Sequence, residues 1–290
     1  HDVSTLSGGQ DSAIWIQNLV NGLSGMTYKV KHAVGSRASA FQKVEVFETY
    51  GYGKILVLAG SVVLTERDEF IYSEMISHPA LLMHPRPRRV CVIGGGDGGV
   101  AREVARHDCV DSIVVVEIDQ LVTEIVREHF PQLRVGLEDS RVDVQIADGG
   151  RYLEQTRHAF DVIIVDSYDP GGPIQSITAE PFYPAVVGAL AENGIAVFQT
   201  DSPTLSAAML RSTDRAVGEL FAEHKPYLCT IPSFPDGLCS FVVAATFEGS
   251  LQRFDESRYG SIGRSCRYYN RHIHEGAFLL PKHVRDVLEG

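Results

Sequence analysis

Short, continuously apolar runs recur through the middle of the chain, and helix-like segments separate them. Val90–Ile93, Ile113–Val116 and Phe160–Val165 all lack the polar–apolar alternation of a half-exposed strand. Such runs are typical of parallel strands that are covered on both faces. Two further strands are predicted at Val142–Ile146, which alternates, and at Ile195–Gln199. The pattern predicts an α/β fold in which helices cover a mostly parallel sheet.

The N-terminal part of the chain has a different pattern. Tyr28–Val30, Phe41–Phe47 and Ile55–Leu58 alternate or are apolar, and glycines separate them. This predicts a small antiparallel β-hairpin domain over residues 1–64, followed by a Rossmann-like catalytic domain with a C-terminal tail over residues 65–290.

Trp15, the only tryptophan, lies in an apolar patch within residues 1–26, which are otherwise weakly patterned. Core packing is the usual role of such a residue, and an aromatic wall over a bound ligand is the alternative. We expect Trp15 to contact the substrate.

A helix is predicted within the stretch TERDEFIYSEMISHPALLMHP, residues 65–85. Thr65 is expected to cap this helix, with Asp68 supplying an acid in its first turn. Tyr72 and Glu74 lie on the helix, and the pattern alone does not distinguish them from ordinary surface residues.

The apolar run at residues 90–93 leads into a glycine-rich turn. Gly94, Gly96 and Gly99 form G-x-G-x-x-G, a helical segment follows, and the next strand ends in Glu117. Glycines let the backbone turn tightly and approach a ligand, and a helix N-terminus presents free N–H groups. An acid at the end of the second strand can accept hydrogen bonds from ribose hydroxyls. The unit indicates a site for a nucleoside-bearing cofactor.

Asp97 argues against a plain dinucleotide site at this turn. Its carboxylate would repel a pyrophosphate and attract a cation. Asp is also common in turns for purely local reasons. A second acidic cluster in the matching place further along the chain nevertheless favours a cationic ligand.

Acidic residues follow four of the apolar strands. Asp97, Glu117 and Asp148 follow the first three, and Asp166 with nearby Asp169 follows the fourth. The carboxyl ends of parallel strands form the edge at which open α/β sheets bind ligands. One acid there would be an ordinary turn residue. The four together predict that Glu117 and Asp148 hold a nucleoside and that the others hold positive groups.

Composition narrows the choice of partners and location. The net charge of −11 argues against nucleic acid, and no apolar run reaches the ~18 residues that span a membrane. The five scattered cysteines form no C-x-x-C pair, which favours a reducing, cytoplasmic location over a disulfide framework or a zinc site. His272 and His274 lack further ligands, so no metal is expected. The chain begins with His1 rather than methionine, which leaves its true start open.

Several stretches, in a consistent order from about Trp15 to Pro281, resemble the spermidine synthase family of polyamine aminopropyltransferases. They are LTERDEFIYSEM (64–75), VIGGGDGGVAREV (92–104), VVEID (115–119), DVIIVDSYDPGGP (161–173), TIPSFPDG (230–237) and YYNRHIHEGAFLLP (268–281). The resemblance implies an N-terminal β-hairpin domain and a methyltransferase-like Rossmann domain. It also implies a homodimer or homotetramer built partly through the N-terminal domain.

Members of this family transfer an aminopropyl group from decarboxylated S-adenosylmethionine to an amine, usually putrescine, giving spermidine and methylthioadenosine. The donor is a sulfonium whose carbon is already activated, so the resemblance implies a co-substrate, with no tightly bound cofactor and no metal. The acceptor amine is protonated near neutral pH and must lose a proton before it attacks. A carboxylate beside it can orient it and accept that proton. The resemblance assigns this role to Asp166 and Tyr72, with Asp169 nearby.

The resemblance implies further roles at the donor and acceptor sites. Glu117 would bind the ribose of the donor, Asp148 its adenine amino group and Asp97 its amine. Other residues implied at the donor site are Gln42, Gly94, Gly96 and Gly149, and those implied at the acceptor site are Trp15, Ser73, Asp169 and Phe234.

The sequence departs from the family pattern mainly near the acceptor. Ala59, Val63, Ser73, Gln175, Phe234 and Cys239 replace the usual Asp, Gln, Gln or His, Glu, Tyr and Trp. The acceptor pocket is therefore expected to be less polar than usual or shaped for another amine, with putrescine as the leading acceptor. A distal ammonium would need an acidic partner, for which Glu74 and Asp201 are the candidates.

Three other functions compete with this interpretation. An S-adenosylmethionine methyltransferase would share the sheet and Glu117, but Asp97 would face the carboxylate of intact S-adenosylmethionine. A non-catalytic binding module would not require Tyr72, Asp97, Asp166 and Asp169 together. A nicotinamide dehydrogenase is the weakest alternative, because no separate catalytic His or Lys constellation stands out.

Overall fold

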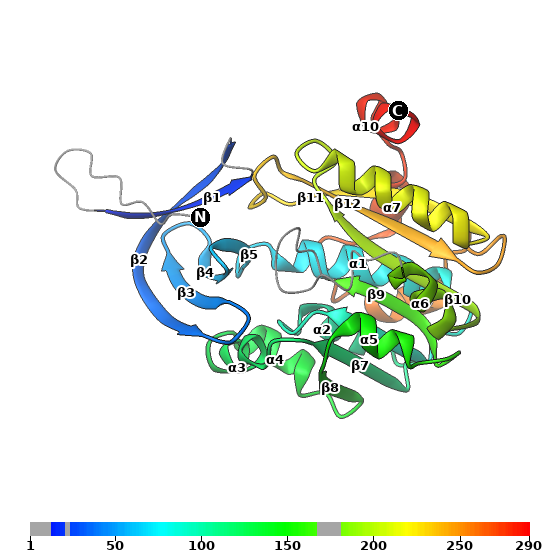
Figure 1. Ribbon diagram of the computed structural model, residues 1–290, viewed down its shortest axis with the longest axis horizontal. Coiled ribbons are helices and arrows are strands. Elements are labelled where there is room, and N and C mark those ends of the chain that lie inside the picture. Colours follow the sequence, from blue (N-terminus) through cyan, green and yellow to red (C-terminus); the bar gives the residue numbers. More distant parts are fainter. Residues whose placement is uncertain (1–12, 21–23, 167–180) are drawn as a thin grey trace.

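The structure is a computed structural model that describes residues 13–20, 24–166 and 181–290. Within these residues the chain forms a five-stranded sheet in the order β1-β2-β3-β4-β5 and a seven-stranded sheet in the order β11-β12-β10-β9-β6-β7-β8 (Figure 1). The first sheet is antiparallel throughout. The predicted α/β fold with a small N-terminal antiparallel β domain is confirmed.

The N-terminal sheet is built from successive hairpins. Its strands are β1 (Ile14–Val20), β2 (Ser24–Ala38), β3 (Lys43–Thr49), β4 (Gly53–Leu58) and β5 (Ser61–Thr65). The sequence pattern misses β1 because its buried positions are Ile16 and Asn18, and the polar Asn18 breaks the apolar alternation. The buried cluster of this sheet consists of Ile16, Tyr28, Val30, Ile55 and Val57.

The seven-stranded sheet is mostly parallel. Its parallel strands are β6 (Arg89–Gly94), β7 (Ser112–Glu117), β8 (Val142–Ile146), β9 (Phe160–Asp166) and β10 (Leu190–Asp201). Beyond β10, the strands β12 (Leu238–Ala245) and β11 (Glu223–Thr230) continue the sheet in antiparallel pairing. The valines and isoleucines of β6 and β9 are almost fully buried, as the continuous apolar runs predict.

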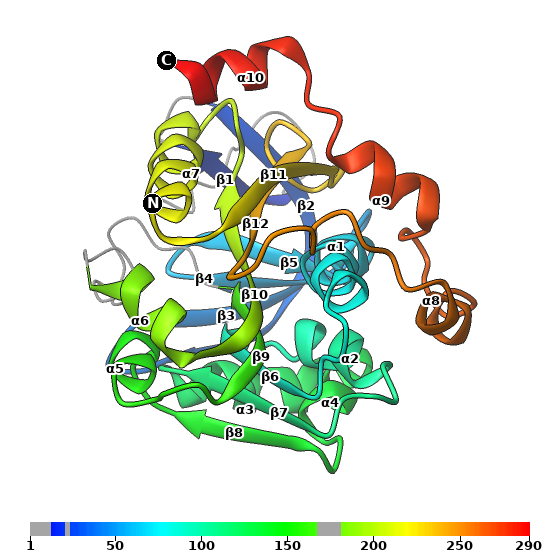
Figure 2. The ribbon, with the colours of Figure 1, turned by 90° about the vertical axis from the view of Figure 1, so that its right-hand side faces the viewer.

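Helices cover both faces of this sheet (Figure 2). On one face lie α1 (Glu69–Met83) and α2 (Gly99–Ala105), with α8 (Glu256–Ile262) and α9 (Arg271–Ala277) from the tail. On the other lie α5 (Gly149–Glu154), α6 (Phe182–Ala189), α7 (Ala207–Leu220) and α10 (Lys282–Glu289). Finally, α3 (Gln120–His129) and α4 (Pro131–Leu137) share a core with β3 and β4, which joins the two sheets.

The structure settles the roles of two residues at α1, and the expected cap is wrong. Thr65 does not cap this helix: it ends β5, Asp68 is the N-cap residue, and the Thr65 hydroxyl donates to Asp68 Oδ1 at 2.6 Å. Glu74 is not a surface residue, since it is fully buried and its carboxylate accepts the backbone N–H groups of residues 267–269. The C-terminal tail therefore covers a helix face that the local pattern does not identify as buried.

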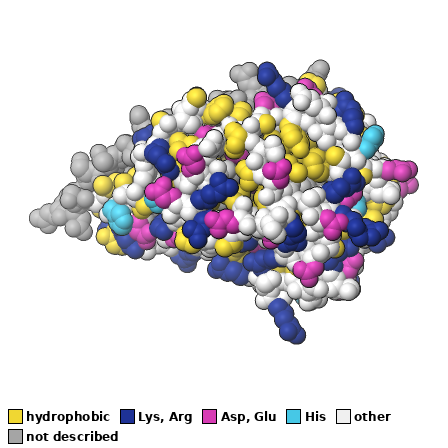
Figure 3. Space-filling view, turned by 90° about the horizontal axis from the view of Figure 1, so that it is seen from below, with side chains coloured by type: hydrophobic (Ala, Val, Ile, Leu, Met, Phe, Trp, Pro, Cys, Tyr) yellow, Lys and Arg dark blue, Asp and Glu magenta, His cyan; other side chains and the backbone are white. Residues whose placement is uncertain are grey.

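The outer surface carries charges of both signs. On the face shown in Figure 3, basic and acidic side chains are interspersed. None of the helices in the described ranges is long and apolar enough to cross a membrane. All five cysteines are free, and His274 of the H-x-H pair is buried with its Nδ1 2.6 Å from the hydroxyl of Tyr269.

Candidate active site

The carboxyl ends of five neighbouring strands form one edge of the seven-stranded sheet, and an acid stands at or just after each end. Taken across the sheet from β8 to β10, these are Asp148, Glu117, Asp97, Asp166 and Asp201, here called the acid row. Their order differs from the order in the sequence because β9 pairs with β6 rather than with β8. Asp97 and Asp166 therefore become neighbours whose charges interact.

Glu117 is held in place by the backbone around it. Its two carboxylate oxygens accept N–H bonds from Gly96 at 3.1 Å and from Asp119 at 2.9 Å. Position 96 requires glycine, because a Cβ there would lie 2.5 Å from Glu117 Oε2. Burial raises the pKa of Glu117 to about 7, although both N–H bonds oppose the shift.

The N-terminal domain reaches this end of the row through Gln42. Its Nε2 donates to Asp119 Oδ2 at 3.1 Å, and the hydroxyl of Ser39 donates to the same oxygen at 2.8 Å. The other carboxylate oxygen of Asp119 accepts the N–H of Leu121 and so caps α3. Sequence reasoning missed Asp119 and Ser39. The signal for Asp119 was its position two residues after Glu117 in the motif VVEID.

Asp148 and Gly149 follow β8, the strand next to the one that ends in Glu117. Asp148 Oδ1 accepts the N–H of Arg151 at 3.0 Å and caps α5. Gly149 is the first residue of that helix and is buried. The structure therefore brings three predicted donor residues, Gln42, Glu117 and Asp148, to the same end of the row.

Asp97 lies within the glycine turn after β6. Gly94 has a left-handed φ of 81°, which lets the chain turn sharply away from the strand. Asp97 Oδ1 accepts the N–H of Gly99 at 2.7 Å. Burial raises the pKa of Asp97, while the Gly99 N–H and the nearby Arg102 lower it. A cationic ligand would favour the charged form of this carboxylate.

Asp166 ends β9 and meets a side chain from α1. The Tyr72 hydroxyl lies 2.5 Å from Asp166 Oδ1 and 2.9 Å from Gln199 Oε1. A phenol has one proton, and we assign it to the shorter contact. Burial, followed by the proximity of Asp97, raises the pKa of Asp166 well above its ordinary value. Burial and then Asp166 raise the pKa of Tyr72, so the hydroxyl remains a donor.

Gln199 was not singled out from the sequence, although it ends a predicted strand. Because β10 runs parallel to β9 with Phe198 opposite Val165, Gln199 stands beside Asp166. Asp201, two residues further on, has a left-handed φ of 57°, which is unusual for a residue other than glycine. Burial and then the nearby Asp236 raise its pKa.

Three of the four predicted acceptor-site residues, Trp15, Ser73 and Phe234, lie in the part of the chain that the structure describes. The Phe234 ring lies 6.5 Å from the Tyr72 ring, measured between centroids. Ser73 is buried, and its hydroxyl donates to Glu69 at 3.3 Å. Trp15 is half-buried on β1. Asp169 and Gln175 are outside the described residues.

The structure also shows where Cys239, Val63 and Glu74 lie, three residues that the sequence placed near the acceptor. Cys239 is fully buried and close enough to Tyr72 to influence its pKa. Val63 is 40% exposed on the N-terminal sheet, away from the buried cores. The carboxylate of Glu74 is already bonded to the tail backbone, so Glu74 is not available as the partner of a distal ammonium.

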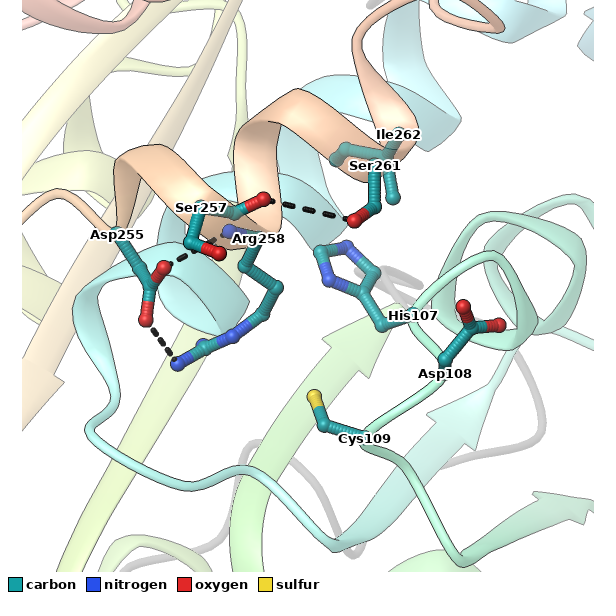
Figure 4. Close-up of a pocket in the computed structure, with 8 residues that line it drawn as sticks. All are labelled: His107, Asp108, Cys109, Asp255, Ser257, Arg258, Ser261 and Ile262. Atoms are coloured by element: carbon teal, nitrogen blue, oxygen red, sulfur yellow. Dashed lines mark hydrogen bonds and ion pairs between the residues drawn. The ribbon is translucent and has the colours of Figure 1, made fainter.

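Two cavities lie at the opposite edge of the sheet, near the amino ends of β6, β7 and β9. One, of about 280 Å³, is lined by His107, Cys109 and residues of α8, toward which the His107 ring points (Figure 4). The other, of about 450 Å³, is lined by residues that include Arg86, Arg89 and Asp161. Neither is lined by a member of the acid row.

Known proteins resemble this chain over nearly its whole length. Residues 69–253 match the Spermine/spermidine synthase domain, and residues 14–66 match the Spermidine synthase tetramerisation domain. The polyamine aminopropyltransferase of Bacillus subtilis is 37% identical over 278 residues, which cover 96% of this chain and 100% of that protein. The spermidine synthase of Schizosaccharomyces pombe is 38% identical over 280 residues, which cover 95% of this chain and 94% of that protein.

Solved structures agree with the sequence relatives. The crystal structure of spermidine synthase in complex with the transition state analogue AdoDATO has a TM-score of 0.92 and 31% identity, covering 100% of this chain and 98% of the other. Spermidine synthase from Thermotoga maritima has a TM-score of 0.88 and 32% identity, with 95% and 94% covered. The resemblance seen in the sequence is confirmed, and the chain belongs to the spermidine synthase family of polyamine aminopropyltransferases.

Proposed function

We propose that this aminopropyltransferase moves the aminopropyl group of decarboxylated S-adenosylmethionine to putrescine, giving spermidine and methylthioadenosine. The observation that carries the proposal is the Tyr72–Asp166 pair beside Asp97, in a row whose other end contains Glu117. A related spermidine synthase, 31% identical to this chain, forms a complex with the transition state analogue AdoDATO, which supports a donor of this class.

In this proposal the donor lies along the β6–β8 end of the acid row. Glu117 accepts hydrogen bonds from the ribose hydroxyls, and Asp148 accepts one from the adenine amino group. Asp97 binds the ammonium of the aminopropyl arm, because an enclosed carboxylate gains most from a cationic partner. The same carboxylate would repel the extra carboxylate of intact S-adenosylmethionine. Asp97 therefore selects for the decarboxylated donor.

The acceptor amine lies beside the hydrogen-bonded pair of Tyr72 and Asp166. Approach of the cationic donor and acceptor favours the ionised form of Asp166, which then accepts one proton from the attacking ammonium. The nitrogen lone pair forms a bond to the aminopropyl carbon as the carbon–sulfur bond breaks. The electrons of that bond go to the sulfonium, and neutral methylthioadenosine leaves. Tyr72 remains protonated and keeps the carboxylate oriented.

We also propose a domain boundary, an oligomeric assembly and a cellular location. We place the domain boundary after residue 64, close to the end of β5 and before α1 begins at Glu69. The N-terminal domain would build a homodimer or homotetramer, and the match of residues 14–66 to a tetramerisation domain supports assembly. The five free cysteines are compatible with the reducing, cytoplasmic location predicted from the sequence.

The test is incubation of the purified protein with decarboxylated S-adenosylmethionine and a panel of amines, with mass detection of products. Spermidine and methylthioadenosine should form when putrescine is the amine. A parallel incubation with intact S-adenosylmethionine should yield no S-adenosylhomocysteine. If the protein prefers another amine, that amine and not putrescine is the acceptor. If S-adenosylhomocysteine is the sole nucleoside product, the proposal is wrong.

A further inference from the structure

A buried set of hydrogen bonds joins the N-terminal sheet to the loop that carries Phe234. It links Tyr28, Thr65, Asp68 and Ser233, here called the Asp68 clasp. Tyr28 lies on β2 and Thr65 ends β5, so both belong to the N-terminal sheet. Asp68 occupies the N-cap position of α1, the helix that carries Tyr72, and Ser233 lies between β11 and β12.

Every polar group of Ser233 is used by the clasp. Its N–H and hydroxyl donate to the two carboxylate oxygens of Asp68 at 2.8 and 2.9 Å. Its carbonyl accepts the Tyr28 hydroxyl at 2.6 Å. Thr65 adds a third donor to Asp68, at 2.6 Å. Asp68 is 3% exposed and Tyr28 is 1% exposed, so removal of the Tyr28 hydroxyl would take a hydrogen-bond donor from the Ser233 carbonyl in a buried environment.

The loop held in this way lies next to the transfer site. Within residues 231–237, the N–H of Phe234 donates to Ile231 and its carbonyl accepts the N–H of Gly237, which closes a tight turn. The far side of the turn is tied down by Asp236, which accepts the hydroxyl of Ser202 after β10. Phe234 is adjacent to Ser233, and its ring lies beside that of Tyr72. The clasp therefore determines where the Phe234 ring stands relative to Tyr72.

We propose that the N-terminal sheet contributes to acceptor binding through the Asp68 clasp. Tyr28, Thr65 and Asp68 are positioning residues that act through Ser233 on the Phe234 loop and so set the affinity for the acceptor amine. The donor site contacts the N-terminal sheet separately, through Gln42 and Asp119. Loss of the clasp should therefore weaken amine binding without weakening donor binding. This inference rests on the proposed transfer at Tyr72 and Asp166.

The first test is steady-state kinetics of Tyr28→Phe, which removes only the hydroxyl. We expect the KM for the amine to rise about 5- to 10-fold, which corresponds to one buried hydrogen bond, and the KM for the donor to change by less than about 2-fold. Thr65→Val should act in the same direction, and Thr65→Ser, which retains the hydroxyl, should stay close to the unaltered protein. A matched control is Tyr183→Phe, whose hydroxyl contacts Thr213 on the other face of the sheet.

The second test does not depend on turnover. Amide hydrogen exchange across residues 231–237 should be faster in Tyr28→Phe than in Tyr183→Phe, while exchange near Glu117 should be equal in the two variants. Equal exchange in the loop would overturn the positioning role. Equal rises in both KM values would overturn the separation of donor and acceptor. If the unaltered protein transfers no aminopropyl group, the proposed function and the kinetic role of the clasp are both wrong. The exchange comparison would still decide whether the clasp positions the loop.

Discussion

The two ends of the acid row hold their carboxylates in different ways. At the β7–β8 end, Glu117 and Asp148 accept N–H bonds from neighbouring backbone, which keeps them in place before any ligand arrives. At the β6–β9 end, Asp97 also accepts one backbone N–H, but Asp166 has a phenol as its hydrogen-bond partner, and burial and then the nearby Asp97 raise its pKa. The first arrangement suits recognition of a neutral nucleoside. The second suits cations, whose arrival relieves the repulsion.

The largest expected effect on turnover is at Asp166. Asp166→Asn keeps the size of the side chain but removes the proton acceptor, so turnover should fall by about 100-fold or more. Donor affinity, measured by calorimetry, should persist because Glu117 and Asp148 are intact. Asp143→Asn, an exposed change on β8, is the control and should leave turnover unchanged. If donor affinity fell together with turnover, Asp166 would also contribute to donor binding, and the two ends of the acid row would not have separate roles.

Asp97→Asn should act on the donor instead. Loss of the carboxylate that pairs with the donor ammonium is expected to weaken donor use by on the order of 2–5 kcal/mol while the fold is retained. Calorimetry with decarboxylated S-adenosylmethionine, accompanied by thermal unfolding of the variant, measures this directly. If donor affinity and turnover are unchanged in the variant, Asp97 does not bind the donor.

Glu117 should make the stability of the unliganded protein depend on pH. Its pKa rises from 4.5 to about 7 on folding, so the stabilisation is present below about pH 4.5 and is lost as pH rises through about 7. Glu117→Gln should lose less stability between pH 5 and pH 8 than the unaltered protein, by up to about 3 kcal/mol. Urea unfolding of both proteins at the two pH values gives this difference. Parallel pH profiles would contradict the burial of this carboxyl.

The smallest expected effect concerns the acceptor. Phe234→Tyr adds a hydroxyl beside Tyr72, and if it reaches the amine, putrescine use should rise about 2- to 10-fold relative to other amines, the value of one hydrogen bond. Competition between putrescine and a longer diamine, with mass detection of both products, measures the ratio. An unchanged ratio in a protein that already uses putrescine efficiently would mean that position 234 does not set acceptor choice.

The local pattern of apolar and polar residues predicted much of the fold and several residues of the site. Continuous apolar runs marked β6, β7 and β9, because a strand covered on both faces needs apolar residues at every position. Glycines and acids at the ends of these runs identified Gly96, Asp97, Glu117 and Asp166 as candidates. Local pattern failed at Glu74 and at β1, where a distant tail and a polar strand residue overrode the simple rule.

Only the tertiary structure decided which of these residues meet. Insertion of β9 between β6 and β10 placed Asp166 beside Asp97 and Gln199, and the packing of α1 on the sheet brought Tyr72 to Asp166. The Asp68 clasp joins residues that are 165 positions apart in the chain. The periodicity of a segment records which of its faces are buried. Strand order and helix docking depend instead on long-range packing between segments, which no local window of the sequence contains.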